Sequence, residues 1–324
     1  MIRIIDSTLA MLDKYVPTRE QIQKFCIFMK EIGIIDLEIS KQIYKEIKEL
    51  PKGFRFYMRK DSFDKQIDYP GIYKYFANQR KNQEKDIKES QMNDIKEIVH
   101  LRLQKDTNQV RIVGLDDIFF HDYLYIFDEI KKIFHKDKII FCPEDTYGCA
   151  TGLAVEWLLN GGKEVTTTFA GCGCRAATEE VYIAMYIVKR YKPTQSLDVL
   201  VKIKKLFEEI TNEKISDFKP ILGEKIFQVE SGIHVDGILK NPANYEAYPP
   251  EKVGQKTEII IGKHSGCNSI LMKCNYLGLK KPNDEKLNIL LKQIKLRSVE
   301  TRNSISDIEF KKIYKEVVEN EAAN

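Results

Sequence analysis

Apolar residues recur with two different periods along the N-terminal part of the chain. Short apolar runs have the length and composition of strands, and between them apolar residues recur at helical spacing. Thr18 and Gln21 form a capping-box pattern at the start of the first such helix, and Gly33 ends it. This β-α-β-α-β order predicts a parallel sheet wrapped by helices. The elements predicted here are strands at 2–9, 34–39 and 54–58 and helices at 18–32 and 41–50.

The pattern weakens after residue 60 and then returns. Residues 81–96 are highly charged and predict an exposed helix or a mobile excursion rather than core, and 95–103 could form a strand. Ser306 and Glu309 form a second capping-box pattern near the C-terminus. The remaining predicted elements are strands at 110–115, from 138, at 164–169 and at 256–261, and helices at 121–134, 149–160, 198–210, 265–277, after Pro282 and from Ser306.

Composition narrows the class of protein. A hydrophobic content of 43% and a charged content of 31% are typical of a globular chain, and 324 residues can hold a barrel-sized domain plus a smaller appendage. Basic and acidic residues, 52 and 48, are interspersed, so nucleic acid is not an expected partner. No run of about 20 apolar residues occurs, so a membrane is not expected either. Seven scattered cysteines do not form a disulfide framework, and no signal-like N-terminus is seen; together these favour a reducing cytoplasm.

Candidate chemistry gathers around His234. The carboxylates of Glu230 and Asp236 flank it, and either could orient an imidazole for acid–base work. Gly232 and Gly237 lie in the same stretch and predict a backbone that approaches a ligand or another chain, rather than a plain strand or helix. On residue types alone, a loop histidine with an ordinary hydrogen bond is the favoured interpretation.

From residue 227 the chain reads F-Q-V-E-S-G-I-H-V-D-G-I-L-K-N-P, and I-G-K-H-S-G follows at 261–266. This stretch resembles the lid of the homocitrate synthase and isopropylmalate synthase family, which reads roughly H-E-S-G-I-H-V-D-G-x-x-K-N-P-x-x-Y and continues to G-K-H-S-G. In that family a (β/α)8 barrel condenses an acyl-CoA with a 2-oxo acid on a divalent metal. The lid of one subunit reaches over the barrel of its partner.

The resemblance assigns roles to individual lid residues. His234, Tyr245 and Glu230 are implied as catalytic, and Ser231 as substrate-binding. The first histidine of the family's lid is Val229 here, which should weaken one lid contact.

The barrel half resembles the same family but departs from it where the chemistry lies. The family's first strand ends D-x-T-L-R-D, and here Ala10 and Met11 replace its catalytic arginine and metal-binding aspartate; Asp13 is displaced by two positions. Glu38 matches the family's strand-two glutamate, and Arg175 matches its G-x-G-E-R arginine. The resemblance implies that Glu38 and Arg175 bind substrate.

Further departures follow in the later strands. Gly114 and Leu115 replace the aspartate and threonine that would meet the oxo acid, and Thr178 replaces an asparagine. Cys142 and Glu144 occupy the positions of the two metal-binding histidines.

Cysteine near neighbouring strand ends raises the question of a rebuilt metal site. Cys142, Glu144, Cys172 and Cys174 could together bind zinc or iron, since thiolates suit a softer metal. C-x-C and C-x-E spacings are weak signatures, and cysteine often drifts into buried positions as a small hydrophobe. We therefore favour drift, with no metal or other cofactor bound by this chain.

The resemblance implies an α/β fold with a (β/α)8-type barrel, then a lid and small α+β and helical subdomains. About 50 residues between the third and sixth strands are too few for the usual units of ~25–30 residues, so part of the barrel should be shortened or missing. The expected domains are a degenerate barrel at 1–193, a linker and lid at 194–250 and a helical subdomain at 251–324. The leucine-sensing regulatory domain of isopropylmalate synthases is not expected.

Erased barrel chemistry beside a retained lid favours a lid that acts in trans. The chain resembles the omega subunits of the two-gene homocitrate synthases of nitrogen-fixing bacteria. This implies a heteromer with a catalytic, metal-holding alpha subunit that converts acetyl-CoA and 2-oxoglutarate to homocitrate and CoA. Two alternatives stay open: a structural or regulatory partner without a chemical role, and a stand-alone condensing enzyme that uses the Cys/Glu site.

Overall fold

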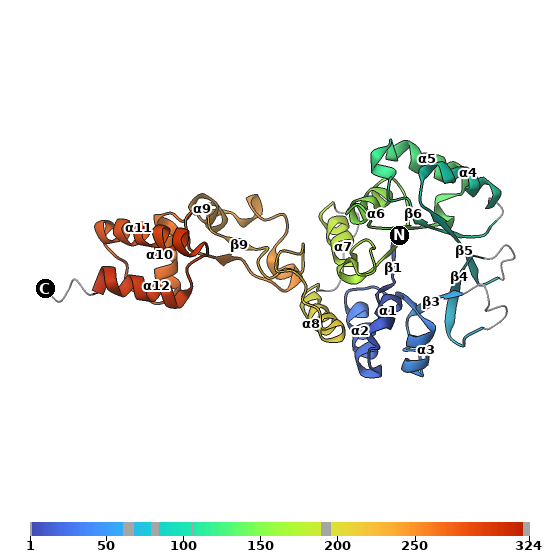
Figure 1. The fold of residues 1–324 in the computed structure, drawn as a ribbon, viewed down its shortest axis with the longest axis horizontal. Coiled ribbons are helices and arrows are strands. Elements are labelled where there is room, and N and C mark those ends of the chain that lie inside the picture. Colours follow the sequence, from blue (N-terminus) through green and yellow to red (C-terminus); the bar gives the residue numbers. More distant parts are fainter. Residues whose placement is uncertain (1, 61–67, 79–83, 105–106, 189–195, 320–324) are drawn as a thin grey trace. The chain divides into compact units, whose positions relative to one another are not determined.

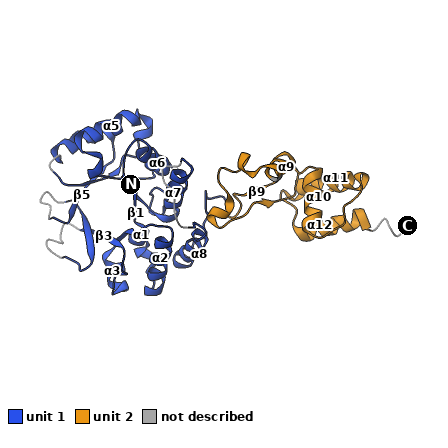
Figure 2. Ribbon diagram, turned by 180° about the vertical axis from the view of Figure 1, so that it is seen from behind, with its two compact units in different colours: residues 1–223 blue, residues 224–324 orange. Residues whose placement is uncertain are grey.

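The computed structural model describes residues 2–60, 68–78, 84–104, 107–188 and 196–319. The chain forms two compact units, 1–223 and 224–324, which are considered separately (Figure 2). The expected boundary at Pro193 lies outside the described residues. The helix at Leu200–Thr211 belongs to the first unit, and the lid stretch shares the second unit with the C-terminal helices.

Eight parallel strands close into a barrel in the first unit. They are β1 (Arg3–Asp6), β2 (Asp36–Ile39), β3 (Arg55–Lys60), β4 (Ile72–Ala77), β5 (Asp86–Met92), β6 (Val110–Gly114), β7 (Ile139–Pro143) and β8 (Glu164–Thr167). Each strand pairs with its neighbour in sequence, and β8 returns to β1 with Arg3 opposite Glu164. The (β/α)8 prediction is therefore confirmed (Figure 1).

Helices cover the outside of the barrel (Figure 1). They are α1 (Thr8–Met11), α2 (Arg19–Glu31), α3 (Lys41–Ile47), α4 (Ile98–Leu101), α5 (Tyr123–Ile133), α6 (Ala150–Leu159), α7 (Thr178–Ile187) and α8 (Leu200–Thr211). The capping box of Thr18 and Gln21 forms at the start of α2, as predicted. Between the strands and the helices, Phe127, Phe141 and Trp157 pack ring against ring in a buried cluster.

The shortening predicted for the barrel lies in its connections and not in its strands. Among the described residues, no helix separates β3 from β4 or β4 from β5. The expectation of an exposed charged segment at 81–96 is wrong for β5, because Ile87 is fully buried and Lys88 donates to the Asn78 carbonyl at 2.8 Å. The expected strand at 95–103 is also wrong, because this stretch is helical and includes α4.

The second unit is built on a two-stranded parallel sheet and four helices. These are β9 (Gln228–Val229), β10 (Glu258–Ile259), α9 (Gly232–Lys240), α10 (Cys267–Tyr276), α11 (Asp284–Thr301) and α12 (Asp307–Tyr314). Ser306 accepts the Glu309 N–H at the start of α12, which is half of the predicted box. Ile261, Ile270 and Phe310 lie in its buried core. Within the described residues, no helix is both long and apolar enough to cross a membrane.

Candidate functional site

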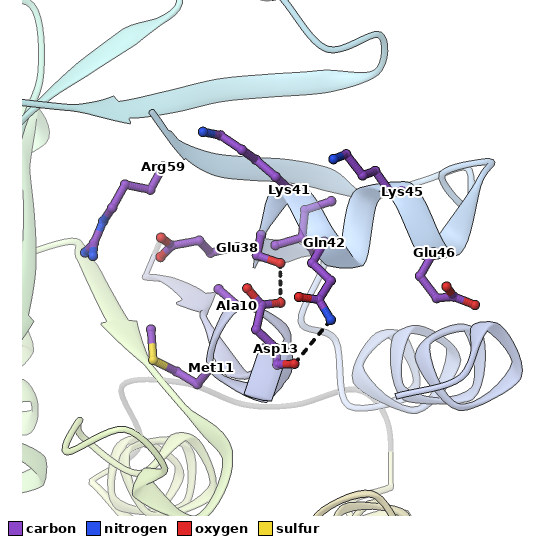
Figure 3. Close-up of a pocket in the computed structure, with 11 residues that line it drawn as sticks. Ala10, Met11, Asp13, Glu38, Lys41, Gln42, Lys45, Glu46 and Arg59 are labelled. Carbon is purple, nitrogen blue, oxygen red and sulfur yellow. Dashed lines mark hydrogen bonds between the residues drawn. The ribbon is translucent and has the colours of Figure 1, made fainter. Parts of the chain in front are cut away.

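A pocket of about 620 Å³ opens at the carboxyl ends of β1 to β3. Ala10 and Met11 line it where the family resemblance predicts an arginine and a metal-binding aspartate. The Asp13 carboxylate accepts a short hydrogen bond from Ser40, and the Glu38 carboxylate extends toward Arg59 (Figure 3). The other lining residues are Ile39, Lys41, Gln42, Lys45 and Glu46.

An ion-pair network, mostly buried except at Arg59, joins β2, β3, β5 and β6 at this pocket. Arg111 of β6 lies 2.5 Å from Glu38 of β2 and 2.5 Å from Glu89 of β5, and Arg59 of β3 reaches Glu89 at 3.1 Å. Ser7 also donates to Glu38 at 2.6 Å. Burial raises the pKa of Glu38, but the Arg111 guanidinium outweighs burial and holds that pKa below its usual range. The network therefore consists of groups that neutralise one another.

Asp6 at the end of β1 is held differently. It is 1% exposed, and it accepts hydrogen bonds from the Thr8 N–H at 3.0 Å and the Thr178 hydroxyl at 2.5 Å. Burial raises its pKa to about 6 against the effect of these two donors. Thr178, where the family has an asparagine, thus fixes the strand-end aspartate and also shares a hydrogen bond with Thr167.

Of the two positions where the family has metal-binding histidines, 142 and 144, the second forms an ion pair within the chain. Glu144 is bound by the Arg175 guanidinium and by the Gln91 amide, the latter at 2.8 Å. Cys142 is 1% exposed, and burial raises the pKa of its thiol even though Arg175 and Arg111 lie close enough to oppose that shift. Two guanidinium groups beside a protonated thiol make a poor place for a cation.

The two remaining candidate ligands do not complete a site. Burial raises the pKa of Cys172 to about 12, which keeps its thiol protonated, and Cys174 is exposed with a φ of 55°. Among the described residues, no three His, Cys, Asp or Glu side chains converge as a cation would need. The donor set of this barrel therefore does not fit the divalent metal of the family.

Glu38 and Arg175, the barrel residues with predicted substrate roles, are both engaged within the chain. Glu38 lines the pocket but is bound by Arg111 and Ser7, and Arg175 is 8% exposed and bound to Glu144. Their substrate-binding roles stay predictions. The structure gives both carboxylate and guanidinium a structural partner.

The sequence predicted that the lid stretch is not a plain helix. That prediction is wrong, because Gly232–Lys240 form the helix α9. His234 lies on α9, exposed, and its ring centroid is 5.7 Å from that of Tyr245 with the planes at 55°. Tyr245 is 46% exposed. Tyr245 directly follows a 3-10 turn at Pro242–Asn244, which comes after α9. The structure thus brings together His234 and Tyr245, two of the three lid residues that the family resemblance predicts as catalytic.

Glu230 and Ser231 lie at the N-terminal end of α9. The Glu230 carboxylate accepts the backbone N–H of His264 at 2.7 Å, so it joins the segment at 227–242 to the G-K-H-S-G segment at 262–266. Ser231 precedes the first turn without a side-chain capping bond. Asp236, the other candidate for orienting His234, pairs with Lys240 at 2.7 Å. The two carboxylates therefore bind other groups than the His234 imidazole in these contacts.

Sequence reasoning missed the network residues Arg111, Glu89 and Arg59. The sequence feature that could indicate such residues is a charged residue at a strand position that faces the barrel interior. A charge is stable there only if a partner from another strand faces it. Arg111 stands within an otherwise apolar strand, V-R-I-V, and is 1% exposed. That pattern could have indicated a buried arginine that requires a carboxylate partner, although it does not name the partner.

Comparison with known proteins places the chain in a family. Residues 221–302 match the family described as homocitrate synthase post-HMGL domain-like. The homocitrate synthase omega subunit of Clostridium pasteurianum is 31% identical over 97% of this chain and 95% of that protein. Homocitrate synthase AksA of Methanothermobacter thermautotrophicus is 34% identical over 60% of this chain, which spans about half (49%) of that protein.

Solved structures support the fold. Hydroxymethylglutaryl-CoA lyase from Pseudomonas aeruginosa superimposes with a TM-score of 0.51 over 66% of this chain and 94% of that chain, at 11% identity. At that identity the likeness concerns the barrel fold alone. The similarity to the omega subunit, in contrast, extends over nearly the full length of the chain. The chain therefore belongs to the homocitrate synthase and isopropylmalate synthase family.

Proposed function

We propose that this chain is the omega-type subunit of a two-chain homocitrate synthase, and that it supplies His234 and Tyr245 to the active site of a partner barrel. One contrast supports the proposal above all. The barrel mouth has its charged groups bound to one another, whereas the lid presents an exposed histidine beside an exposed tyrosine. A similar omega subunit supports the division of one enzyme over two chains.

The barrel of this chain lacks what the condensation needs. An aldol-type addition requires the 2-oxo acid carbonyl to be held and polarised, and in this family a divalent metal does so. Met11, Cys142 and Glu144 do not offer such an ion a donor set, and Ala10 cannot balance developing negative charge. We therefore assign the condensation to the partner barrel.

The lid of this chain offers proton-transfer chemistry. In the proposed reaction the acetyl methyl of acetyl-CoA loses a proton and its carbon adds to the ketone of 2-oxoglutarate, whose oxygen gains a proton. Water then cleaves the thioester and releases homocitrate and CoA. Histidine commonly carries such protons, so His234 would act at the methyl or at the ketone oxygen, and the Tyr245 hydroxyl would support it by hydrogen bonding.

The test is a His234→Ala variant co-expressed with the intact-barrel homologue of the same cell. Homocitrate formation from acetyl-CoA and 2-oxoglutarate should fall about 10²- to 10⁴-fold, the usual contribution of an acid–base group, while the complex still co-purifies. His135→Ala is the matched control, because His135 is also exposed but lies in the first unit. It should keep the wild-type rate.

Two results would contradict the proposal. An unchanged rate for His234→Ala in an intact complex would favour a purely structural partner. Condensation by this chain alone would restore the stand-alone enzyme. Replacing 2-oxoglutarate by other 2-oxo acids in the same assay identifies the substrate.

A further inference from the structure

Gly237 lies directly beneath the ring of Tyr245. A Cβ built on Gly237 would fall 2.1 to 2.4 Å from the Cζ, Cε2 and Oη atoms of Tyr245. Carbon atoms in contact are normally about 3.5–4.0 Å apart, so no side chain larger than hydrogen fits while the ring stays in place. The tyrosine packs on bare helix backbone.

The same face of α9 carries His234. Residues three apart on a helix are surface neighbours, so the backbone of Gly237 and the side chain of His234 lie side by side. A ring that rests on Gly237 is thereby brought next to the imidazole, which explains the 5.7 Å between the centroids of His234 and Tyr245.

The main chain around Tyr245 is fixed on both sides. The Asn241 N–H donates to the Gly237 carbonyl at 2.8 Å, and the Tyr245 N–H donates to the Pro242 carbonyl at 2.9 Å. After the tyrosine, the Glu246 N–H donates to the Pro242 carbonyl at 2.9 Å. With its backbone held at these points, the Tyr245 ring can be moved only through its side-chain torsions.

We propose that Gly237 is a positioning residue, which sets the Tyr245 hydroxyl beside the His234 imidazole by leaving room for the ring. The proposal rests on the proposed function for its consequence in catalysis, but its geometric content concerns this chain alone. Gly232 in the same helix has a different task. A Cβ there would meet the backbone of Gly266 at 3.1 Å, so that glycine allows two segments of main chain to pack closely.

Substitution of Gly237 by alanine should move the tyrosine and leave the fold intact. The atoms that an alanine methyl would meet belong to the far end of one side chain, which can rotate away toward solvent. Alanine is also favoured over glycine inside a helix. The helix should therefore persist with a displaced Tyr245.

The first experiment needs no partner and no activity. The His234 imidazole protons of the histidine-labelled chain are assigned by NMR through a His234→Asn variant. Because a nearby aromatic ring shifts these resonances, Tyr245→Leu and Gly237→Ala should move them in the same direction. Gly152→Ala, a matched glycine inside α6 whose Cβ would have ordinary contacts of 3.5 and 3.6 Å with Phe119, should leave them unchanged. A Gly237→Ala spectrum with the wild-type His234 signals would overturn the proposal.

The second experiment is a double-mutant cycle in the co-expressed pair. Gly237→Ala and Tyr245→Ala should lower kcat by similar factors, roughly 10- to 100-fold for a displaced group, and the double variant should lose no more than Tyr245→Ala alone. Gly152→Ala should keep the wild-type kcat. Multiplying effects in the double variant would overturn the positioning role. A neutral His234→Ala would instead overturn the proposed function, while the NMR result still decides the geometry.

Discussion

The barrel mouth and the lid helix hold their polar groups in opposite ways. In the barrel, Arg111 and Glu38 are 1% and 2% exposed and bind each other, and Arg175 and Glu144 form a second pair. On α9, His234 is exposed and contacts the ring of Tyr245. The barrel pairs its charged groups with one another, whereas α9 and the turn after it place two exposed rings side by side.

This difference bears on what each region can do. A charge that is buried and paired loses much of its value for chemistry, because a substrate would have to displace its partner and face the cost of desolvation. A side chain that is exposed but held in place can enter the pocket of another chain without such a rearrangement. The first arrangement stabilises the barrel. The second leaves His234 and Tyr245 accessible to another molecule.

The largest effect should follow from breaking the barrel's ion-pair network. Arg111→Met leaves Glu38 and Glu89 buried without their shared cation, and removal of one member of a buried pair costs about 3–5 kcal/mol. Urea denaturation monitored by fluorescence measures this directly, because Trp157 is the one tryptophan of the sequence and lies buried in the barrel unit.

The control for this experiment is a matched arginine on the surface. Arg102→Met removes an exposed guanidinium 3.8 Å from Glu129 and should change the free energy of unfolding little. The NMR signals of His234 should be unchanged in Arg111→Met, since α9 belongs to the other unit. An unfolding free energy equal to wild type would show that the network adds nothing to the barrel.

A smaller effect should appear in the pH dependence of barrel stability. Glu179 of α7 is 1% exposed; its Oε2 accepts the Ala170 N–H at 2.9 Å, and its Oε1 has no hydrogen-bond partner among the described residues. Burial raises its pKa from 4.5 to about 7. Between these values the folded chain keeps a proton that the unfolded chain releases, so stability falls as pH rises from about 4.5 to 7.

Glu179→Gln isolates this contribution. The variant cannot ionise, so its free energy of unfolding, measured by urea denaturation, should fall less between pH 5 and 8 than that of wild type, by an amount on the order of 2–3 kcal/mol. Glu285→Gln, in the second unit, should keep the wild-type slope because Trp157 reports the first unit. Equal slopes for Glu179→Gln and wild type would mean that the carboxyl is ionised in the folded barrel.

Local patterns predicted those elements whose stability is local. The capping residues Thr18 and Gln21 lie within one turn of each other, so the start of α2 could be identified from the sequence. β5 could not be identified, since its charged Glu89 is stabilised inside the barrel by Arg111, which lies 22 residues further along the chain. Charge favours solvent unless its partner is known, and the sequence does not reveal the partner.

The candidate site likewise has features that the sequence could predict and features that it could not. Both His234 and Tyr245 could be named from the motif, but the helix that carries His234 could not be predicted. Two glycines within nine residues argue against a helix on propensity alone. Contacts of Gly232 with Gly266 and of Gly237 with Tyr245 override that propensity, and these contacts exist only in the folded unit.

The smallest effect should come from substitution of Glu230. This substitution tests whether the carboxylate only holds the lid segment together or also takes part in the reaction. Its Oε1 accepts the His264 N–H at 2.7 Å, and a glutamine oxygen can accept the same bond without a charge. Glu230→Gln in the co-expressed pair should therefore keep kcat within about threefold of wild type, since the hydrogen bond is retained. Glu230→Ala removes the acceptor and should lower kcat further. If Glu230→Gln lowered kcat as much as His234→Ala does, the Glu230 carboxylate would itself be a proton-transfer group.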